Sequence, residues 1–339
     1  CRSLPDRGGH RHGEAAPSGR SLYVGLKMHG VVVIDKPPGR TSHDVVAMVR
    51  RKLGGVRAGH TGTLDPLATG VLPVCLGEAT KLVPFLAGAV KDYQATMLLG
   101  VRTDTLDISG LVLDRKEPDV DGEIVRETLK GFVGRISQTP PRYSAVKVRG
   151  QALYKWARKG IEVTAPPRQV EIYSLIVEEV SLPYVRLRLS CSGGTYVRSL
   201  CADAGDLLGC GACLAGLRRT RSGAFNEVMA LPMGQEEGRD ERERLCAAII
   251  PTAAALPELP EVEVGESWQQ KIRDGVQPRA EMVNNRDDIP FLAPGDMVKL
   301  VDKKGGLAAI AKMLCGSGDF PGLPGSAPVM SLVRVFNEN

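Results

Sequence analysis

One stretch of the chain combines glycines, a proline and a lone carboxylate: GHTGTLDPLATGVL, residues 59–72. Its three glycines allow the backbone to approach a ligand closely, and Pro66 biases Asp65 toward an extended loop. Asp65 is the only acid between Asp44 and Glu78. Four basic residues precede it: Arg50, Arg51, Lys52 and Arg57. We therefore expect an ionised Asp65 in a rigid loop.

The isolation of Asp65 limits the chemistry it can perform. A lone carboxylate does not suit glycoside hydrolysis by two carboxylates or a carboxylate-rich metal site. It suits a nucleophile or a general base. An Asx-turn before Pro66 is the structural alternative, and it is the more common role of an isolated Asp-Pro pair.

Outward from this stretch, the pattern predicts a mixture of strands and helices. Strands are expected at 31–34 and 93–99, and the alternation of Val185, Leu187 and Leu189 with polar residues predicts a half-buried strand with a basic outer face. Helices are expected after the caps Thr41-Ser42 and Asp121, at 153–159 and at 195–208. Strict βαβ alternation is not kept, so we predict an α+β domain with a mixed or antiparallel sheet and flanking helices.

A second, smaller unit is expected near the C-terminus. Charged residues at 235–243 and the prolines that follow mark a boundary. Short β-like runs at 297–301, 307–313 and 331–336 then predict a small β-barrel-like domain. We expect a catalytic domain at 28–250 and a second domain at 257–339, preceded by a disordered extension at 1–27.

Charge and cysteine usage narrow the class of protein. The 339 residues carry 44 Lys+Arg and 39 Asp+Glu, a net charge of +5 that does not by itself indicate a nucleic-acid partner. No apolar run approaches the roughly 18–20 residues of a membrane span, and residues 1–27 lack a signal-peptide core, so we expect a cytoplasmic protein without membrane contact.

Cys210 and Cys213 form a CxxC pair, but a zinc site needs two further ligands, so structural cysteines are favoured.

Basic residues gather in two places. Residues 142–159 contain six bases and no acid, interleaved with Tyr143, Tyr154 and Trp156. This pattern favours contact with an RNA backbone over a merely solvated face. The second cluster lies at 218–221. The predicted backbone contacts are Arg142, Lys147, Arg149, Lys155, Arg158, Lys159, Arg218 and Arg219.

The 59–72 stretch belongs to a longer set of motifs with a strong resemblance. GVVVIDKP at 30–37, KDY at 91–93, GVRTDT at 100–105, PPRYSAVK at 140–147, GTYVRSL at 194–200 and LRRT at 217–220 occur in order around it. This series closely resembles the TruB family of bacterial tRNA pseudouridine-55 synthases. It covers about 30–225. The C-terminal segment is more weakly similar to the PUA RNA-binding domain.

The resemblance implies an activity and roles for single residues. Members of the family break the bond between ribose C1′ and N1 of a T-loop uridine and rejoin the ribose to C5 of the base. This chemistry needs no cofactor or metal. The resemblance implies a tRNA T-arm as partner and no obligate protein partner. The family's catalytic aspartate falls on Asp65 and its paired arginine on Arg198, while Lys36 has a supporting role. Tyr93 corresponds to the residue that stacks on the flipped base; the remaining pocket residues are Tyr196, Leu217 and His60.

Other functions remain open at this level. The same motifs could serve an RNA-guided synthase that depends on partner proteins. An RNA-binding module without catalysis could use the same surface, although the set of Asp65, Tyr93 and Arg198 disfavours it. A thiol-redox protein rests on Cys210 and Cys213 alone.

Overall fold

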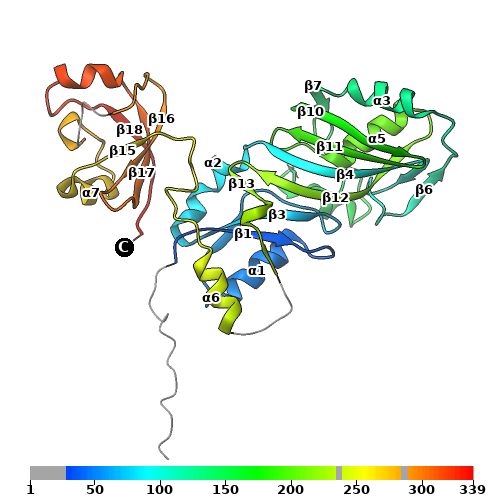
Figure 1. The fold of residues 1–339 in the computed structure, drawn as a ribbon, viewed down its shortest axis with the longest axis horizontal. Helices are drawn as coiled ribbons and strands as arrows, with labels where there is room; N and C mark the ends of the chain where they lie inside the picture. The colour runs from blue at the N-terminus through cyan, green and yellow to red at the C-terminus, as the bar shows by residue number, and fades with distance from the viewer. Residues whose placement is uncertain (1–27, 234–238, 284–288, 339) are drawn as a thin grey trace, which may run out of the picture.

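The computed structural model describes residues 28–233, 239–283 and 289–338. The predicted extension at 1–27 lies outside them. Figure 1 shows two sheets, the larger at the right of the view and the smaller at the left. No helix in the described parts of the chain has the length and apolar character needed to cross a membrane.

The larger sheet is mixed, as the sequence predicts. Its strand order is β14-β1-β3-β12-β4-β11-β10-β7, with β2 paired to β3 and β13 to β12. The pairs β1–β14 and β3–β12 are parallel, and the others are antiparallel. The strands are β1 (Gly30–Lys36), β2 (Ala58–His60), β3 (Thr69–Leu76), β4 (Lys91–Leu99), β7 (Gly134–Gln138), β10 (Arg168–Ser181), β11 (Tyr184–Cys191), β12 (Ala212–Ser222), β13 (Phe225–Asn226) and β14 (Leu231–Pro232).

Helices and short hairpins flank this sheet. Thr41 and Asp44 form a capping box at the start of α1, and the Asp121 side chain caps α3, as expected from the sequence. Helix α5 packs on β12, and α3 packs on β10 (Figure 1). The elements are α1 (Ser42–Lys52), η1 (Gly77–Leu82), α2 (Val83–Ala87), β5 (Val101–Thr103), β6 (Val112–Arg115), α3 (Gly122–Lys130), β8 (Lys147–Val148), β9 (Gln151–Ala152), α4 (Leu153–Ala157), α5 (Val197–Leu207), η2 (Glu227–Met229) and α6 (Arg239–Ala247).

The C-terminal sheet has the order β15-β16-β17-β18 and its own apolar core. Two of its expected strands, 297–301 and 307–313, have the predicted bounds. A further apolar cluster joins this sheet to β1 and β3, and the Lys81 ammonium donates to the Val335 carbonyl at 3.0 Å. The elements are β15 (Glu261–Glu263), α7 (Glu266–Arg273), η3 (Ala280–Met282), β16 (Met297–Val301), β17 (Leu307–Met313), η5 (Ser317–Gly322) and β18 (Met330–Val335).

The candidate site that contains Asp65 forms where β3 begins beside β12. A Cβ on Gly70 would lie 2.2 Å from the Arg219 carbonyl oxygen, and Gly70 has a φ of +98°. Only glycine therefore allows the two strands to approach at this point. This approach brings the 61–68 loop against the middle of the sheet.

Candidate active site

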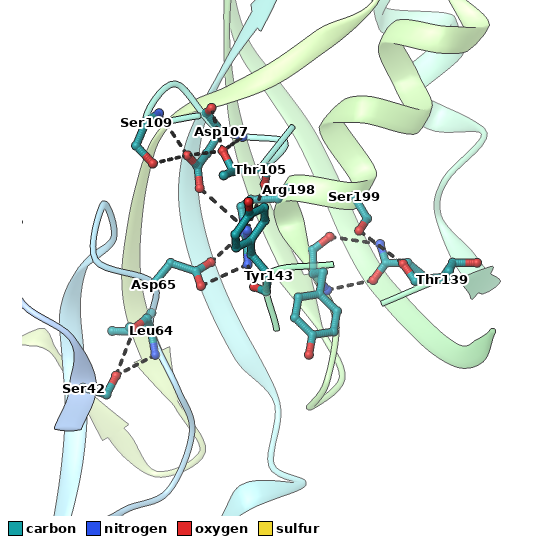
Figure 2. Close-up of polar contacts among 12 residues, drawn as sticks. Ser42, Leu64, Asp65, Thr105, Asp107, Ser109, Thr139, Tyr143, Arg198 and Ser199 are labelled. Atoms are coloured by element: carbon teal, nitrogen blue, oxygen red, sulfur yellow. Dashed lines mark hydrogen bonds and ion pairs between the residues drawn. The ribbon is translucent and has the colours of Figure 1, made fainter. Parts of the chain in front are cut away.

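Asp65 lies on a loop that is fastened from several sides. The Ser42 hydroxyl donates to the Leu64 carbonyl at 3.0 Å and accepts from the Leu64 amide at 2.8 Å (Figure 2). The Lys36 ammonium donates to the carbonyls of Pro66 at 3.3 Å and Ala68 at 2.6 Å. The backbone on both sides of Asp65 is thus held, and the carboxylate projects from a fixed base.

Arg198 on α5 holds the Asp65 carboxylate with two nitrogens. Its Nε lies 2.8 Å from Oδ2, and its Nη2 donates to Oδ1 at 3.0 Å. The guanidinium also donates to the carbonyls of Thr105 at 2.9 Å and Tyr143 at 3.0 Å. Only 3% of Arg198 is exposed. This planar, two-atom contact fixes the carboxylate in a way that a lysine ammonium could not.

Asp107 is a functional candidate that the sequence interpretation missed. Its Oδ2 lies 3.7 Å from Arg198 Nη1, so Arg198 stands between two carboxylates (Figure 2). Thr105 Oγ1 and the Ser109 amide each donate to its Oδ1 at 2.9 Å. Leu106 has a φ of +63°, a strained conformation for a branched residue. It separates the Thr105 carbonyl and the Asp107 carboxylate, both of which face Arg198.

The surroundings of Asp65 act on its ionisation in opposite directions. Burial raises the pKa of Asp65 above its ordinary value, Arg198 opposes that rise, and Asp107 adds to it. The basic residues near Asp65 in the sequence suggest only a lowering of its pKa. Asp65 therefore depends on Arg198 for its charged form more than the sequence suggested.

The predicted pocket residues lie around this pair. Tyr93 is 7% exposed, and burial raises its pKa, with Arg219 and Asp65 acting on it as well. Burial also raises the pKa of Tyr196, which feels both Arg198 and Asp65. Backbone bonds to the Gln138 side chain hold Tyr196 at the start of α5. Leu217 is half-buried against the same apolar cluster as Tyr93.

His60 lies at the end of β2, on the other side of the loop. Its ring contacts His43 edge to face, with 5.4 Å between centroids. Burial, His43 and Arg219, in that order, lower the pKa of His60 to about 4. A cavity of about 390 Å³ opens beside the two histidines, with Arg57 and Thr80 also in its wall. At neutral pH His60 is therefore an uncharged ring facing a cavity.

Comparison with known proteins establishes the family of the chain. A model of the TruB family pseudouridylate synthase N-terminal domain matches residues 50–197, and one of the tRNA pseudouridylate synthase B C-terminal domain matches 198–256. A Syntrophus aciditrophicus protein named tRNA pseudouridine synthase B is 50% identical over 311 residues, covering 92% of this chain and 99% of that protein. The chain belongs to the TruB family. A Geobacter sulfurreducens protein of the same name is 42% identical, covering 91% of this chain and 100% of that protein.

Solved structures agree with membership of the TruB family. An H/ACA RNP bound to a substrate RNA containing 2′-deoxyuridine gives a TM-score of 0.68 at 27% identity, over 96% of this chain and 92% of that chain. A Cbf5-Nop10-Gar1 complex gives 0.68 at 30% identity, over 96% and 91%. The α+β fold is thus that of the pseudouridine synthases, and the chain is an isomerase.

The first basic cluster of this TruB-family chain is open to solvent. All six of its predicted contacts are exposed, namely Arg142, Lys147, Arg149, Lys155, Arg158 and Lys159. Arg158 and Lys159 lie over the rings of Tyr154 at 5.3 Å and Trp156 at 5.8 Å. The cluster therefore presents both positive charge and aromatic surface.

The second basic cluster differs from the expectation. Arg219 is 1% exposed, so it cannot reach an RNA backbone. Arg218 donates to both Asp35 carboxylate oxygens at 3.0 Å and also pairs with Glu227. Adjacent residues of a strand point to opposite faces, which separates the two arginines. The Arg219 prediction is thus wrong, whereas the half-exposed Arg218 is paired with carboxylates and its contact with RNA stays a prediction.

Metal and thiol chemistry find little support in the described residues. Within those ranges no group of three or more His, Cys, Asp or Glu could hold a metal ion. Cys210 and Cys213 are buried free thiols, and burial raises the pKa of Cys213 to about 11. A thiol that is buried and protonated is a poor nucleophile.

Proposed function

We propose that this chain converts the uridine at position 55 in the T-loop of tRNA to pseudouridine. The observation that carries the proposal is the Asp65–Arg198 contact, which holds one carboxylate beside Tyr93 and Tyr196. Membership of the TruB family and relatives named tRNA pseudouridine synthase B support the substrate.

The proposed reaction uses Asp65 at the sugar and leaves the base otherwise unchanged. The bond from ribose C1′ to N1 breaks, the base turns, and C1′ joins C5. The proton leaves C5 and N1 gains one, so nothing is oxidised. Asp65 either attacks C1′ or removes a proton from C2′; both routes need the ionised carboxylate that Arg198 orients.

Access to the glycosidic bond requires that the uridine leave the T-loop. Tyr93 would stack on the extruded base, which is worth about 1–3 kcal/mol. Tyr196 and Leu217 would line the same pocket, and His60 would take the space that the base leaves. The half-buried positions of Tyr196 and Leu217 are compatible with this arrangement.

Phosphate contacts would come from the exposed cluster at 142–159. In the same segment the Tyr143 carbonyl accepts a hydrogen bond from Arg198, so tRNA bound there would contact the segment that helps to hold the residue that orients Asp65. The C-terminal sheet would serve as a PUA-like RNA-binding domain at 257–339. The enzyme would act in the cytoplasm.

An RNA-guided activity with protein partners is the second candidate, because the similar solved structures are multi-component complexes. The relatives at 40–50% identity instead carry the name tRNA pseudouridine synthase B. We therefore favour a protein that acts alone on tRNA.

Incubation of an unmodified tRNA transcript with this protein alone tests the proposal. Pseudouridine should form at position 55 and at no other uridine, without metal, nucleotide or a second protein. A transcript with cytidine at position 55 is the matched control. Modification that requires added partners or guide RNA, or that occurs elsewhere, would overturn the proposal.

A further inference from the structure

Three buried cations lie behind the Asp65 loop: Arg219, Lys91 and Lys36, which are 1%, 4% and 0% exposed. They donate hydrogen bonds to backbone carbonyls, and Arg219 also bonds the Tyr93 hydroxyl. Among the described residues none of the three forms an ion pair with a carboxylate. A buried cation without a counter-ion is costly, because carbonyl dipoles replace only part of its hydration.

Arg219 is central to this group. Its Nε donates to the Val71 carbonyl at 2.7 Å, and its Nη2 donates to the Gly62 carbonyl at 3.2 Å. Its Nη1 lies 3.5 Å from the position that a Cβ on Gly62 would occupy. Arg219 pairs with Tyr93 across β12 and β4. The guanidinium therefore lies between the Asp65 loop and Tyr93.

The charge of Arg219 affects the pKa values of several neighbouring residues. Burial is the largest cause of a lowered pKa of about 8 at both Lys36 and Lys91, and Arg219 adds to it in both. At Lys36 the charge of Asp65 opposes this lowering. A hydrogen bond and the charge of Arg219 both act on the Tyr93 hydroxyl against the effect of burial. The positive potential of this side of the loop thus reaches the wall of the proposed base pocket.

The proposed reaction creates a charge that this potential would stabilise. When the C1′–N1 bond breaks, its electron pair leaves with the base, which becomes a uracil anion. In the covalent route Asp65 displaces N1 from C1′, and C5 then displaces Asp65 from C1′. In the other route Asp65 takes the C2′ proton, which leaves a C1′=C2′ double bond, and returns that proton to C2′ as C5 joins C1′. In both, the anion persists until C5 joins C1′, and afterwards C5 loses a proton and N1 gains one.

We propose that Arg219 is a positioning residue for this step: it fixes Tyr93 and the Gly62 carbonyl, and its charge stabilises the uracil anion. The inference rests on the proposed function and deepens it. Fixed positive charge in a site closed to water needs no reorganisation as the anion forms. This use explains why a guanidinium without a carboxylate is retained in the core.

The test compares Arg219→Gln and Arg219→Lys with wild type in single-turnover reactions on tRNA. Arg219→Gln should slow the conversion of uridine about 10²-fold, and Arg219→Lys about 10-fold or less. The dissociation constant for tRNA should stay within about 3-fold, since Arg219 does not reach the phosphates.

A second substrate separates electrostatic support from a merely structural role. Fluorine at C5 stabilises the uracil anion without enlarging the base much, so tRNA that carries 5-fluorouridine should depend less on Arg219. Loss of the N-linked 5-fluorouridine from nuclease digests measures bond cleavage. The deficit of Arg219→Gln should shrink to about 10-fold on this substrate. Equal deficits on both substrates would overturn the inference.

Arg219→Lys provides a test even where Arg219→Gln does not fold. Burial lowers the pKa of the neighbouring Lys36 and Lys91 to about 8, so a buried ammonium at position 219 should also have a lowered pKa. The ratio of its rate to that of wild type should therefore fall as the pH rises. A ratio that is flat with pH would overturn the inference. A wild-type enzyme that makes no pseudouridine would instead overturn the proposed function.

Discussion

The Asp65 loop separates two regions that hold buried charge in different ways. On one side, Arg198 lies between the carboxylates of Asp65 and Asp107. On the other side, Arg219 and two lysines donate to backbone carbonyls, and Arg219 also bonds the Tyr93 hydroxyl. None of these three cations forms an ion pair with a carboxylate among the described residues. The first region brings opposite charges together, and the second gathers three positive charges.

The difference shows two uses of a buried cation. A paired guanidinium fixes the direction of a carboxylate, so its contribution lies in geometry. A guanidinium held by carbonyls keeps its potential available to a charge that appears only during reaction. Removing one partner of the first kind leaves an uncompensated charge, whereas changes in the second region should act on the rate or on the response of stability to pH.

The largest effect should come from Asp65→Asn, which removes the one carboxylate that the proposed chemistry requires. We expect the rate of pseudouridine formation to fall about 10⁴-fold or more, because loss of a nucleophile or base commonly has effects of this size. Binding of tRNA should change little, since phosphate contacts dominate affinity. Single-turnover rates and filter binding measure the two quantities.

Asp119→Asn is the matched control, because it makes the same chemical change at an exposed residue outside the site. It should leave the rate unchanged. Substantial pseudouridine from Asp65→Asn would exclude the catalytic assignment and leave only a structural role for the paired region.

Smaller effects are expected at Arg198 and Asp107, and they should differ in size. Arg198→Lys keeps the charge but loses the two-atom contact, so we expect a rate about 10²-fold lower. Asp107→Asn removes a residue that acts through Arg198, and an effect of about 10-fold is expected. Both variants should bind tRNA normally.

The pH dependence of these variants should shift in opposite directions. The proposed reaction needs ionised Asp65, so activity should fall as the pH drops through its pKa, which burial raises. Arg198 lowers that pKa by its charge and by a side-chain hydrogen bond. Arg198→Lys keeps the charge but weakens the bond, so it should move the acid limb of the rate profile to higher pH. Asp107 raises the pKa, so Asp107→Asn should move the limb to lower pH. Shifts in the same direction would contradict the balance of charges in the paired region.

Much of the fold and of the paired region follows from local sequence signals. The capping box of α1 and the alternation of β11 are properties of neighbouring residues, and both elements have the expected positions. Strand β3 was missed because residues 71–76 are buried on both faces, so no period-two pattern marks them. The motif containing Asp65 therefore ends in a central strand that composition alone did not reveal.

The contacts that define the two regions are long-range. Asp107 and Arg198 are 91 residues apart in sequence, and nothing local indicates that they meet. The burial of Arg219 is easier to predict from the sequence, because alternation along β12 places Arg218 and Arg219 on opposite faces. The run of arginines instead predicts contacts to an RNA backbone. The sequence therefore predicts the residue types of the site better than their exposure.

The smallest expected effect concerns His60, which lies on the side of the accumulated positive charge. Burial, His43 and Arg219 lower the pKa of His60 from 6.5 to about 4. In the unfolded chain His60 takes up a proton near pH 6.5, and in the folded chain only near pH 4, so acid favours unfolding. Between about pH 6.5 and 5.5 this residue should lower the free energy of unfolding by about 1 kcal/mol.

Urea unfolding of wild type and His60→Gln at several pH values measures this contribution. Other titrating groups, including Asp65, are common to both proteins, so the difference between their pH slopes isolates His60. His43→Gln removes a neighbouring ring that adds to the shift, and its slope should lie between the other two. Identical slopes for wild type and His60→Gln would mean that His60 titrates normally. A protonated His60 would then cost no stability beside the positive charges behind the Asp65 loop. The two regions would differ only in the geometry of their contacts.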